Sequence, residues 1–322
     1  MQDRSWQSLV EGVCGGEPRA LAKLISRVES REPGWQQAMK ALYPHTGKAR
    51  ILGITGSPGA GKSSLANRLA AGLVERGHRV GVIAVDPSSP FSGGALLGDR
   101  LRMRDVATTA DVFIRSMATR GSLGGLAQGT RDVARVLDAA GYDLILIETV
   151  GVGQDEIEIV RAADVVMVVC VPGQGDGVQA LKAGIMEIAD LFVVNKSDRD
   201  GADQVVADIR GMLALAGDDH GELETVFQTD ALSGRGVDAL IDALRTRAER
   251  LPRLADRALE RAREEVLTLI EREIARRVRV RLAGDARLQE AVEQIQSRRS
   301  DPYTAAESLL ADFAGVGGDA HE

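Results

Sequence analysis

The chain has 322 residues, of which 44% are hydrophobic and 27% are charged, and its formal net charge is −7. These values are typical of a globular protein with a sizeable core, and the negative balance argues against a dedicated nucleic-acid binder, which needs a basic face. No apolar run approaches the roughly 20 residues that cross a bilayer, and the N-terminus has no apolar signal core. We therefore expect a soluble, most simply cytoplasmic protein with no membrane partner.

Residues 1–47 show the spacing of amphipathic helices. Apolar residues recur three or four positions apart, at Leu9, Val13, Leu21, Leu24, Ile25 and Val28. This spacing places them on one face of a helix. The sequence Glu32-Pro33-Gly34 interrupts the pattern, and residues 44–47 are typical of a linker. We predict an N-terminal helical segment over residues 1–47.

Residues 48–250 alternate short apolar runs with helix-like stretches. The runs are rich in Val and Ile and mostly lack alternation, which is typical of strands buried on both faces of a parallel sheet. They are Arg50–Thr55, Val80–Val85, Val112–Arg115, Leu144–Glu148, Val165–Val171, Leu191–Val194 and Thr225–Gln228. The pattern predicts an α/β fold with a doubly wound, mostly parallel sheet. Ligands bind at the carboxyl ends of such strands.

A phosphate-binding loop follows the first run and precedes a helix-like stretch. Its residues are Gly56, Ser57, Pro58, Gly59, Ala60, Gly61, Lys62, Ser63 and Ser64. They match the P-loop NTPase pattern GxxxxGK[ST] in its strand–loop–helix context. Glycines leave the loop amides uncovered for phosphate oxygens, and the helix N-terminus adds a favourable dipole. We predict that Lys62 reaches the β- and γ-phosphates and that the Ser63 hydroxyl ligates Mg²⁺.

Acidic residues end two of the predicted strands. Asp86 ends the second run and Glu148 ends the fourth, where neighbouring strands deliver side chains toward a nucleotide. Because Mg²⁺ prefers oxygen ligands, we assign both residues to the metal and the attacking water. Asp99, in the Gly-rich stretch 91–100, is a third candidate for the metal.

A Gly-containing segment follows Glu148. The Gly151 amide can bind the γ-phosphate, and loss of that contact would release residues 150–156 as an order–disorder switch. Gln154 is a candidate for positioning the attacking water. The sequence alone does not assign an arginine finger among Arg100, Arg102, Arg104 and Arg120, so we expect slow hydrolysis by the isolated protein.

The tetrapeptide Asn195-Lys196-Ser197-Asp198 follows the sixth run and predicts guanine recognition. The Asp198 carboxylate can accept hydrogen bonds from the N1–H and exocyclic amine of guanine. Adenine lacks both donors, so such a site rejects it by on the order of 10⁴ or more. The Lys196 stem can cover the base, and Asn195 can tie this loop to the phosphate loop. The expected ligands are therefore GTP and GDP.

A base-backing segment is expected after the last run. It comprises Asp230, Ala231 and Leu232, and the Ala231 amide can be offered to the guanine oxygen. The usual residue at the Asp230 position is Ser.

Residues 251–322 carry no strand signal. Between Ala258 and Leu282 the apolar residues are spaced mainly four apart, at Leu259, Val266, Ile270, Ile274, Val278 and Leu282. One apolar stripe on a long, charged helix indicates packing on a partner, often a second copy of the chain. A further helix is predicted over Pro302–Phe313. Together these form a predicted C-terminal helical dimerisation segment.

Three stretches together resemble one family. They are Val-Asp-Pro-Ser-Ser-Pro at 85–90, Gly-Asp-Arg-Leu-Arg-Met at 98–103 and Glu-Thr-Val-Gly-Val-Gly-Gln at 148–154. Over nearly its whole length the chain resembles the MeaB/ArgK group of methylmalonyl-CoA mutase-associated GTPases. The resemblance implies a G-protein chaperone that gates cofactor delivery from a cobalamin adenosyltransferase to an adenosylcobalamin-dependent acyl-CoA mutase and protects that mutase. It also implies homodimers formed through the C-terminal helices and mutase-stimulated hydrolysis.

The resemblance also assigns roles to residues. The family's phosphate, metal and catalytic positions fall on Lys62, Ser63, Asp86, Asp99 and Glu148. Residues 173–189 look like an additional switch of the family. The residues that would couple the nucleotide state to the partner are Arg102, Asp176, Gln179 and Lys182. The sequence departs from the family pattern at Asp155 and Asp230.

Two other classes stay open. A nickel-inserting GTPase needs Cys or His near its switches, whereas the histidines here are scattered, at His45, His78, His220 and His321. A small-substrate kinase of the arginine-transport type needs an acceptor pocket and usually a closing lid, and the sequence shows no clear lid segment.

Overall fold

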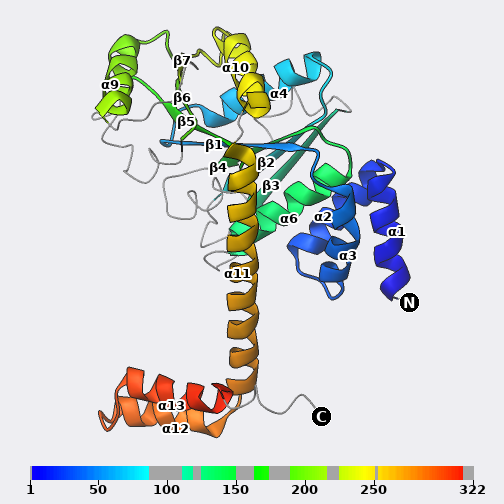
Figure 1. Cartoon of the computed structure of the whole chain (residues 1–322), viewed down its shortest axis with the longest axis vertical. Helices are drawn as coiled ribbons and strands as arrows, with labels where there is room; N and C mark the ends of the chain where they lie inside the picture. The colour runs from blue at the N-terminus through cyan, green and yellow to red at the C-terminus, as the bar shows by residue number, and fades with distance from the viewer. Residues whose placement is uncertain are drawn as a thin grey trace. The chain divides into compact units, whose positions relative to one another are not determined.

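The computed structural model describes the chain at residues 2–86, 111–118, 125–149, 163–173, 189–215, 225–250 and 253–314 (Figure 1). It consists of two compact units, Met1–Leu251 and Pro252–Glu322. No described helix is both long and apolar enough to serve as a membrane span.

The first unit begins with the predicted helical segment. Its helices are α1 (Gln2–Cys14), α2 (Pro18–Glu29) and α3 (Trp35–Leu42), followed by a 3₁₀ turn at Tyr43–His45. Pro18 occupies the first turn of α2, where its missing N–H is harmless. The apolar positions of α2 are buried and pack toward α6 (Gly125–Ala139). The helical reading of this segment is confirmed.

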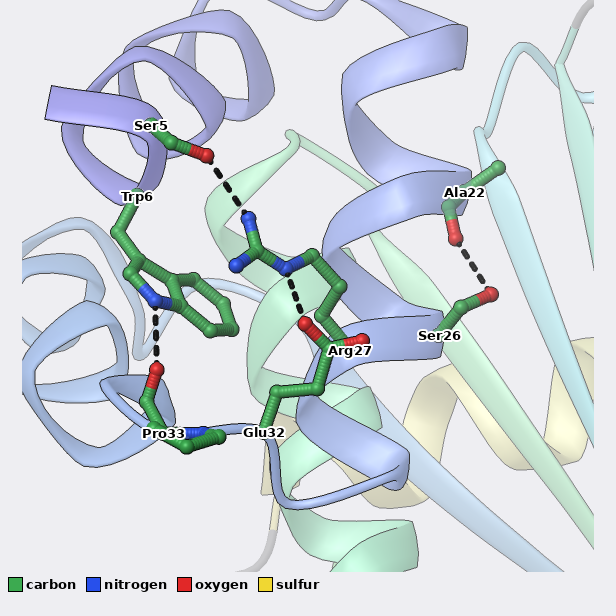
Figure 2. A network of polar contacts seen from close by, with 7 residues as sticks. All are labelled: Ser5, Trp6, Ala22, Ser26, Arg27, Glu32 and Pro33. Atoms are coloured by element: carbon green, nitrogen blue, oxygen red, sulfur yellow. Dashed lines mark hydrogen bonds and ion pairs between the residues drawn. The ribbon is translucent and has the colours of Figure 1, made fainter. Parts of the chain in front are cut away.

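A polar network joins α1, α2 and the turn before α3 (Figure 2). The Trp6 indole donates to the Pro33 carbonyl at 2.9 Å, and the Arg27 guanidinium lies 3.9 Å from the centre of the Trp6 ring. Arg27 also donates to Glu32 at 2.7 Å and to Ser5 at 3.0 Å. Because these partners come from separate elements, the network fixes the angles between them.

The sheet of the first unit is parallel and has the strand order β3-β2-β4-β1-β5-β6-β7 among the described residues. Its strands are β1 (Arg50–Gly56), β2 (Val80–Asp86), β3 (Val112–Ala118), β4 (Leu144–Thr149), β5 (Val165–Cys170), β6 (Leu191–Val194) and β7 (Val226–Gln228). The predicted runs all form strands. The largest boundary difference is β3, which extends to Ala118 through pairing with β2.

Helices cover both faces of the sheet (Figure 1), which explains the absence of alternation in the sequence. Val165, Met167 and Val169 of β5 pack with α4 (Lys62–Glu75) and α10 (Val237–Arg250), whereas Val166, Val168 and Cys170 pack with α9 (Ala202–Leu215). Alternate residues of β5 point to opposite faces of the sheet, and both faces are therefore covered by apolar side chains. The doubly wound α/β fold is confirmed.

A buried carboxylate fixes the connection from the N-terminal helices to β1. Asp138, near the end of α6, accepts hydrogen bonds from the amides of Gly47, Lys48 and Ala49 at 2.5, 3.2 and 3.0 Å. Three donors on one carboxylate satisfy the backbone of a segment that belongs to neither a helix nor a strand.

The second unit contains α11 (Arg253–Leu282), α12 (Ala286–Gln296) and α13 (Pro302–Ala314). Sequence reasoning predicted the first and last of these but missed α12, whose few apolar residues lie among polar ones. Its start is nevertheless marked by Asp285, whose carboxylate accepts from the Arg287 amide at 2.9 Å. On α11, Leu259, Val266, Ile270 and Ile274 are 49–75% exposed.

An ion pair joins the turn after α2 to α6. Arg31 Nη1 lies 2.6 Å from Asp132 Oδ2, and Gln128 donates to the other carboxylate oxygen at 3.2 Å. The Asp132 side chain is 4% exposed, whereas that of Arg31 is 33% exposed. Burial raises the pKa of the Asp132 carboxyl, and the Arg31 guanidinium acts in the opposite direction. Arg31 is therefore the main group that favours the charged form of this buried carboxyl, and Arg135, at 3.7 Å, acts in the same direction.

We predict that Arg31→Ala lowers the free energy of unfolding by about 1–3 kcal/mol, because the buried carboxylate loses its hydrogen-bonded cation and keeps the more distant Arg135, at 3.7 Å. Adding Asp132→Asn should recover part of the loss by removing that charge. The loss should also shrink as the pH falls, because a carboxyl with a raised pKa in the folded state gains stability on protonation. Urea denaturation at several pH values measures all three effects.

The exposed Arg19 of α2, the helix that precedes Arg31, provides the control. Arg19→Ala should leave stability nearly unchanged. A double variant that is no more stable than Arg31→Ala alone would contradict the prediction.

Candidate nucleotide-binding site

The phosphate loop connects β1 to α4 and needs glycine at three positions. Gly56, Gly59 and Gly61 have φ values of 138°, 75° and 85°, a region that side chains disfavour. A Cβ at Gly56 would lie 2.1 Å from the Val169 carbonyl oxygen of β5, and one at Gly61 would lie 2.5 Å from Asn195 Nδ2. These glycines therefore allow the loop to lie directly against β5 and the Asn195 side chain.

Lys62 opens α4 with its ammonium held over the loop. The side chain is buried, and Nζ donates to the carbonyls of Gly56 at 2.6 Å and Ser57 at 3.1 Å. A phosphate oxygen carries charge and is a stronger acceptor than a neutral carbonyl. The ammonium is thus placed to exchange these carbonyls for a phosphate lying in the loop.

Ser63 and Glu148 meet although they are 85 residues apart in sequence. Ser63 Oγ donates to Glu148 Oε1 at 2.5 Å, and Glu148 is 1% exposed near the end of β4. Asp86, the last residue of β2, lies at the same edge of the sheet, because Ala84 pairs with Glu148 in register. A hydroxyl and a carboxylate are hard oxygen donors, so the pair Ser63–Glu148 fits Mg²⁺ by its chemistry.

The side chain of Asn195 joins three loops. It is 1% exposed; Nδ2 donates to the Ala60 carbonyl at 2.8 Å, and Oδ1 accepts from Thr229 Oγ1 at 3.2 Å and from the Ala231 amide at 3.1 Å. The predicted tie between the Asn195-Lys196-Ser197-Asp198 loop and the phosphate loop is confirmed. A second tie is the donation from Lys196 Nζ to the Gly59 carbonyl at 2.7 Å.

The base-backing segment differs in one respect from the sequence prediction. Sequence reasoning offers the Ala231 amide to the guanine, whereas this amide donates to Asn195 Oδ1. The reason is packing: Ala231 is 5% exposed and lies directly beneath the loop that Asn195 begins. A guanine oxygen would therefore have to share this amide.

The substitution of Asp230 for the usual Ser has a structural explanation. Asp230 Oδ1 accepts from the Leu232 amide at 3.0 Å, and the pKa of the carboxyl is lowered by the Ser233 side chain and then by that amide. A serine hydroxyl closes the same kind of turn. Asp230 therefore keeps the turn while replacing a hydroxyl by a charge.

A shallow hollow of about 550 Å³ lies beside the predicted guanine-recognition loop. It is lined by residues 197–203 with Gln228 and Arg235, and so includes the exposed Asp198. Lys196 and Ala231 do not line it. Asp198 therefore faces the hollow from the loop that follows β6.

Several predicted residues lie outside the part of the chain that the structure describes. They are Asp99, Gly151, Gln154, Asp155, Arg100, Arg102, Arg104, Arg120, Asp176, Gln179 and Lys182. Asp86 is placed by its backbone alone.

Sequence reasoning missed two arginines at the site. Arg68 on α4 donates to the carbonyls of Ala231 and Leu232, and Arg235 donates to Ser197 Oγ at 3.2 Å. Neither arginine belongs to a contiguous motif, and in the sequence neither differs from an ordinary exposed arginine. Only the folded chain brings them to their partners.

Comparison with known proteins agrees with this geometry. The model of the family described as methylmalonyl Co-A mutase-associated GTPase MeaB matches residues 21–283. A Pyrococcus abyssi protein, whose own designation as a GTPase is provisional, is 46% identical over 315 residues, covering 96% of this chain and 97% of that protein. The Escherichia coli GTPase ArgK is 42% identical over 238 residues, covering 71% of this chain and 72% of ArgK.

A solved structure described as an LAO/AO transport system kinase also aligns over 98% of this chain and 99% of its own, with a TM-score of 0.69 and 28% identity. The family match spans most of the sequence and includes the phosphate loop, the Ser63–Glu148 pair and the guanine-recognition loop. The chain therefore belongs to the MeaB/ArgK family of methylmalonyl-CoA mutase-associated GTPases.

Proposed function

We propose that this chain is a magnesium-dependent GTPase that serves an adenosylcobalamin-dependent acyl-CoA mutase, most directly methylmalonyl-CoA mutase, as a chaperone. The observation that carries the proposal is the Asn195 bridge, which joins the phosphate loop to the base-backing segment at the start of the proposed guanine-recognition loop. The choice of client rests on the family, which is named for its association with this mutase.

The chain's own groups suit a triphosphate. Backbone amides of the loop and the N-terminus of α4 provide donors and a favourable dipole for the anion. Lys62 adds an ammonium that is already held over the loop. Because the loop lies against β5 through Gly56, its backbone donors are positioned before the substrate binds.

The Ser63–Glu148 pair is proposed to hold the magnesium ion. When bound, Mg²⁺ neutralises charge on the β- and γ-phosphates. Ser63 and Glu148 supply oxygens on one side, and their 2.5 Å hydrogen bond fixes the hydroxyl with respect to the carboxylate. The backbone position of Asp86 at the same sheet edge supports its proposed share in this site. Asp99 and the Gly151 amide remain proposed partners of the metal and the γ-phosphate.

Base selection is proposed to reside in the loop after β6. Lys196 has a left-handed backbone, with φ of 57°, and its ammonium is anchored on Gly59, so that its stem runs across the phosphate loop. Asp198 lies exposed two residues later, free to accept hydrogen bonds from a base.

We further propose that nucleotide exchange on the mutase is linked to delivery of its cofactor by a cobalamin adenosyltransferase.

The apolar stripe of α11 supports a homodimer. Leu259, Val266, Ile270 and Ile274 are 49–75% exposed within the second unit. Association with a second copy would remove these side chains from water, at about 25 cal/mol per Å² of apolar surface.

We predict that Asp198→Asn weakens GDP binding about a hundredfold or more, because it removes hydrogen bonds that a charged acceptor makes to guanine. Titration calorimetry with magnesium should show this loss for GDP and little change for ADP. Asp200→Asn, the same change at an exposed neighbour, serves as the control. Equal GDP affinity in the Asp198 variant and the wild type would refute the base assignment.

Purified methylmalonyl-CoA mutase should accelerate GTP hydrolysis by this protein, which we expect to be slow alone because the sequence assigns no arginine finger. Phosphate release with and without mutase measures the effect, and Lys62→Ala should abolish it with nucleotide binding. Fast hydrolysis that the mutase leaves unchanged would contradict the chaperone proposal. Formation of phosphoarginine from GTP and arginine would instead favour a kinase, as the solved relative's description suggests.

We predict that Ile270→Glu combined with Ile274→Glu halves the mass measured by light scattering. The double variant buries two unpaired charges per chain at the interface, at a cost of roughly several kcal/mol. Thr268→Glu, off the stripe on the same helix, should leave the mass unchanged. A monomeric wild-type protein would exclude the dimer.

A further inference from the structure

Arg68 connects the helix of the phosphate loop to the base-backing segment. It lies in the second turn of α4, which begins at Lys62. Its Nε donates to the Ala231 carbonyl at 3.0 Å and its Nη2 to the Leu232 carbonyl at 2.6 Å. Ala231 and Leu232 lie 163 and 164 positions after Arg68 in the sequence. One guanidinium thus holds two successive peptide groups of the base-backing segment.

These contacts complete the restraint of Ala231. Its amide donates to Asn195 Oδ1 at 3.1 Å, its carbonyl accepts from Arg68, and its methyl group is buried among α4 and α10 side chains. The backbone of Ala231 is therefore held on both of its peptide groups. Neither restraint alone sets the tilt of the segment, because a single hydrogen bond permits rotation about its axis.

The guanidinium suits this task better than an ammonium would. Its donors are coplanar and fixed relative to one another, so two donations fix the orientation of the acceptors as well as their distance. The charge strengthens both hydrogen bonds to the neutral carbonyls. Arg68 is exposed, so it achieves this without a large desolvation cost.

We infer that Arg68 is a positioning residue for guanine recognition. It sets the position of the base-backing segment relative to the phosphate loop, so the residence time of guanine nucleotides depends on a side chain assigned to neither phosphate nor base. The inference rests on the proposed binding of GTP at this site. It adds a determinant of nucleotide selectivity that comes from α4 and not from the guanine-recognition tetrapeptide.

Arg76 provides a matched control on the same helix. It lies two turns beyond Arg68, near the end of α4, where Nη2 contacts Asp238 of α10 at 2.9 Å and Nη1 donates to the Gly72 carbonyl at 2.9 Å. Like Arg68 it is an arginine that joins α4 to a later part of the chain. Unlike those of Arg68, its contacts lead to α10 and to its own helix, at Asp238, Asp242 and Gly72. A general effect of removing an arginine from α4 would appear in both variants.

The test compares wild type, Arg68→Ala, Arg68→Lys and Arg76→Ala, using GDP and ADP that carry a fluorescent ribose label. Stopped-flow dissociation gives the residence time, and equilibrium titration gives the ratio of GDP to ADP affinity. Arg68→Ala should release GDP about tenfold faster and lower the affinity ratio by a similar factor, since two charge-assisted hydrogen bonds are lost. Arg68→Lys should be intermediate, and Arg76→Ala should stay within about twofold of wild type.

Three results would overturn the inference, and they are distinguishable. If wild type prefers GDP and Arg68→Ala keeps its dissociation rate and affinity ratio, Arg68 does not position the base-backing segment. Equal losses in Arg68→Ala and Arg76→Ala would likewise show a general role of α4. If wild type itself shows no preference for GDP over ADP, the proposed function fails, and the inference fails with it. An unchanged thermal unfolding midpoint in Arg68→Ala would exclude a global loss of structure as the cause of faster release.

Discussion

The buried side-chain amide of Asn195 is the interaction on which the site depends. Its donor and acceptor ends are both used, and they reach the phosphate loop on one side and the base-backing segment on the other. In a buried environment, breaking one of these hydrogen bonds leaves a polar group without water, so the three loops are held in one arrangement. Phosphate binding and base recognition, which are separate chemical tasks, thereby share a single rigid frame.

The sheet brings the participants of this frame together. β1 lies between β4 and β5, so the loop that leaves β1 has Glu148 of β4 on one side. On its other side lie β5 and then β6, which Asn195 directly follows. All these strands are parallel and end at the same edge, which is where ligands bind in open α/β sheets. Apolar layers of α4 and α10 on one face and of α6 and α9 on the other hold the strands in place.

The sequence predicted the site where chemistry is encoded in neighbouring residues and failed where it depends on packing. Residues 56–64 and the tetrapeptide from Asn195 are contiguous, and Glu148 was found because it ends an apolar run. Arg68 and its Ala231 partner are 163 residues apart, and nothing near Arg68 indicates which carbonyls it meets. The same holds for Arg31 with Asp132, 101 residues apart. α12 was missed although Leu288, Val292 and Ile295 have the spacing of one helix face and Asp285 marks its start.

The contact between Gly56 and β5 limits how the family fold can vary. The hydrogen atom on its α-carbon is the largest substituent that fits against the Val169 carbonyl, since a methyl group would approach within 2.1 Å of that oxygen. Both atoms belong to the main chain, so no exchange of a neighbouring side chain can make room. At most packed positions, a second substitution nearby can compensate for a larger side chain. Here no such substitution can help, so the position admits only glycine for as long as β1 and β5 remain adjacent.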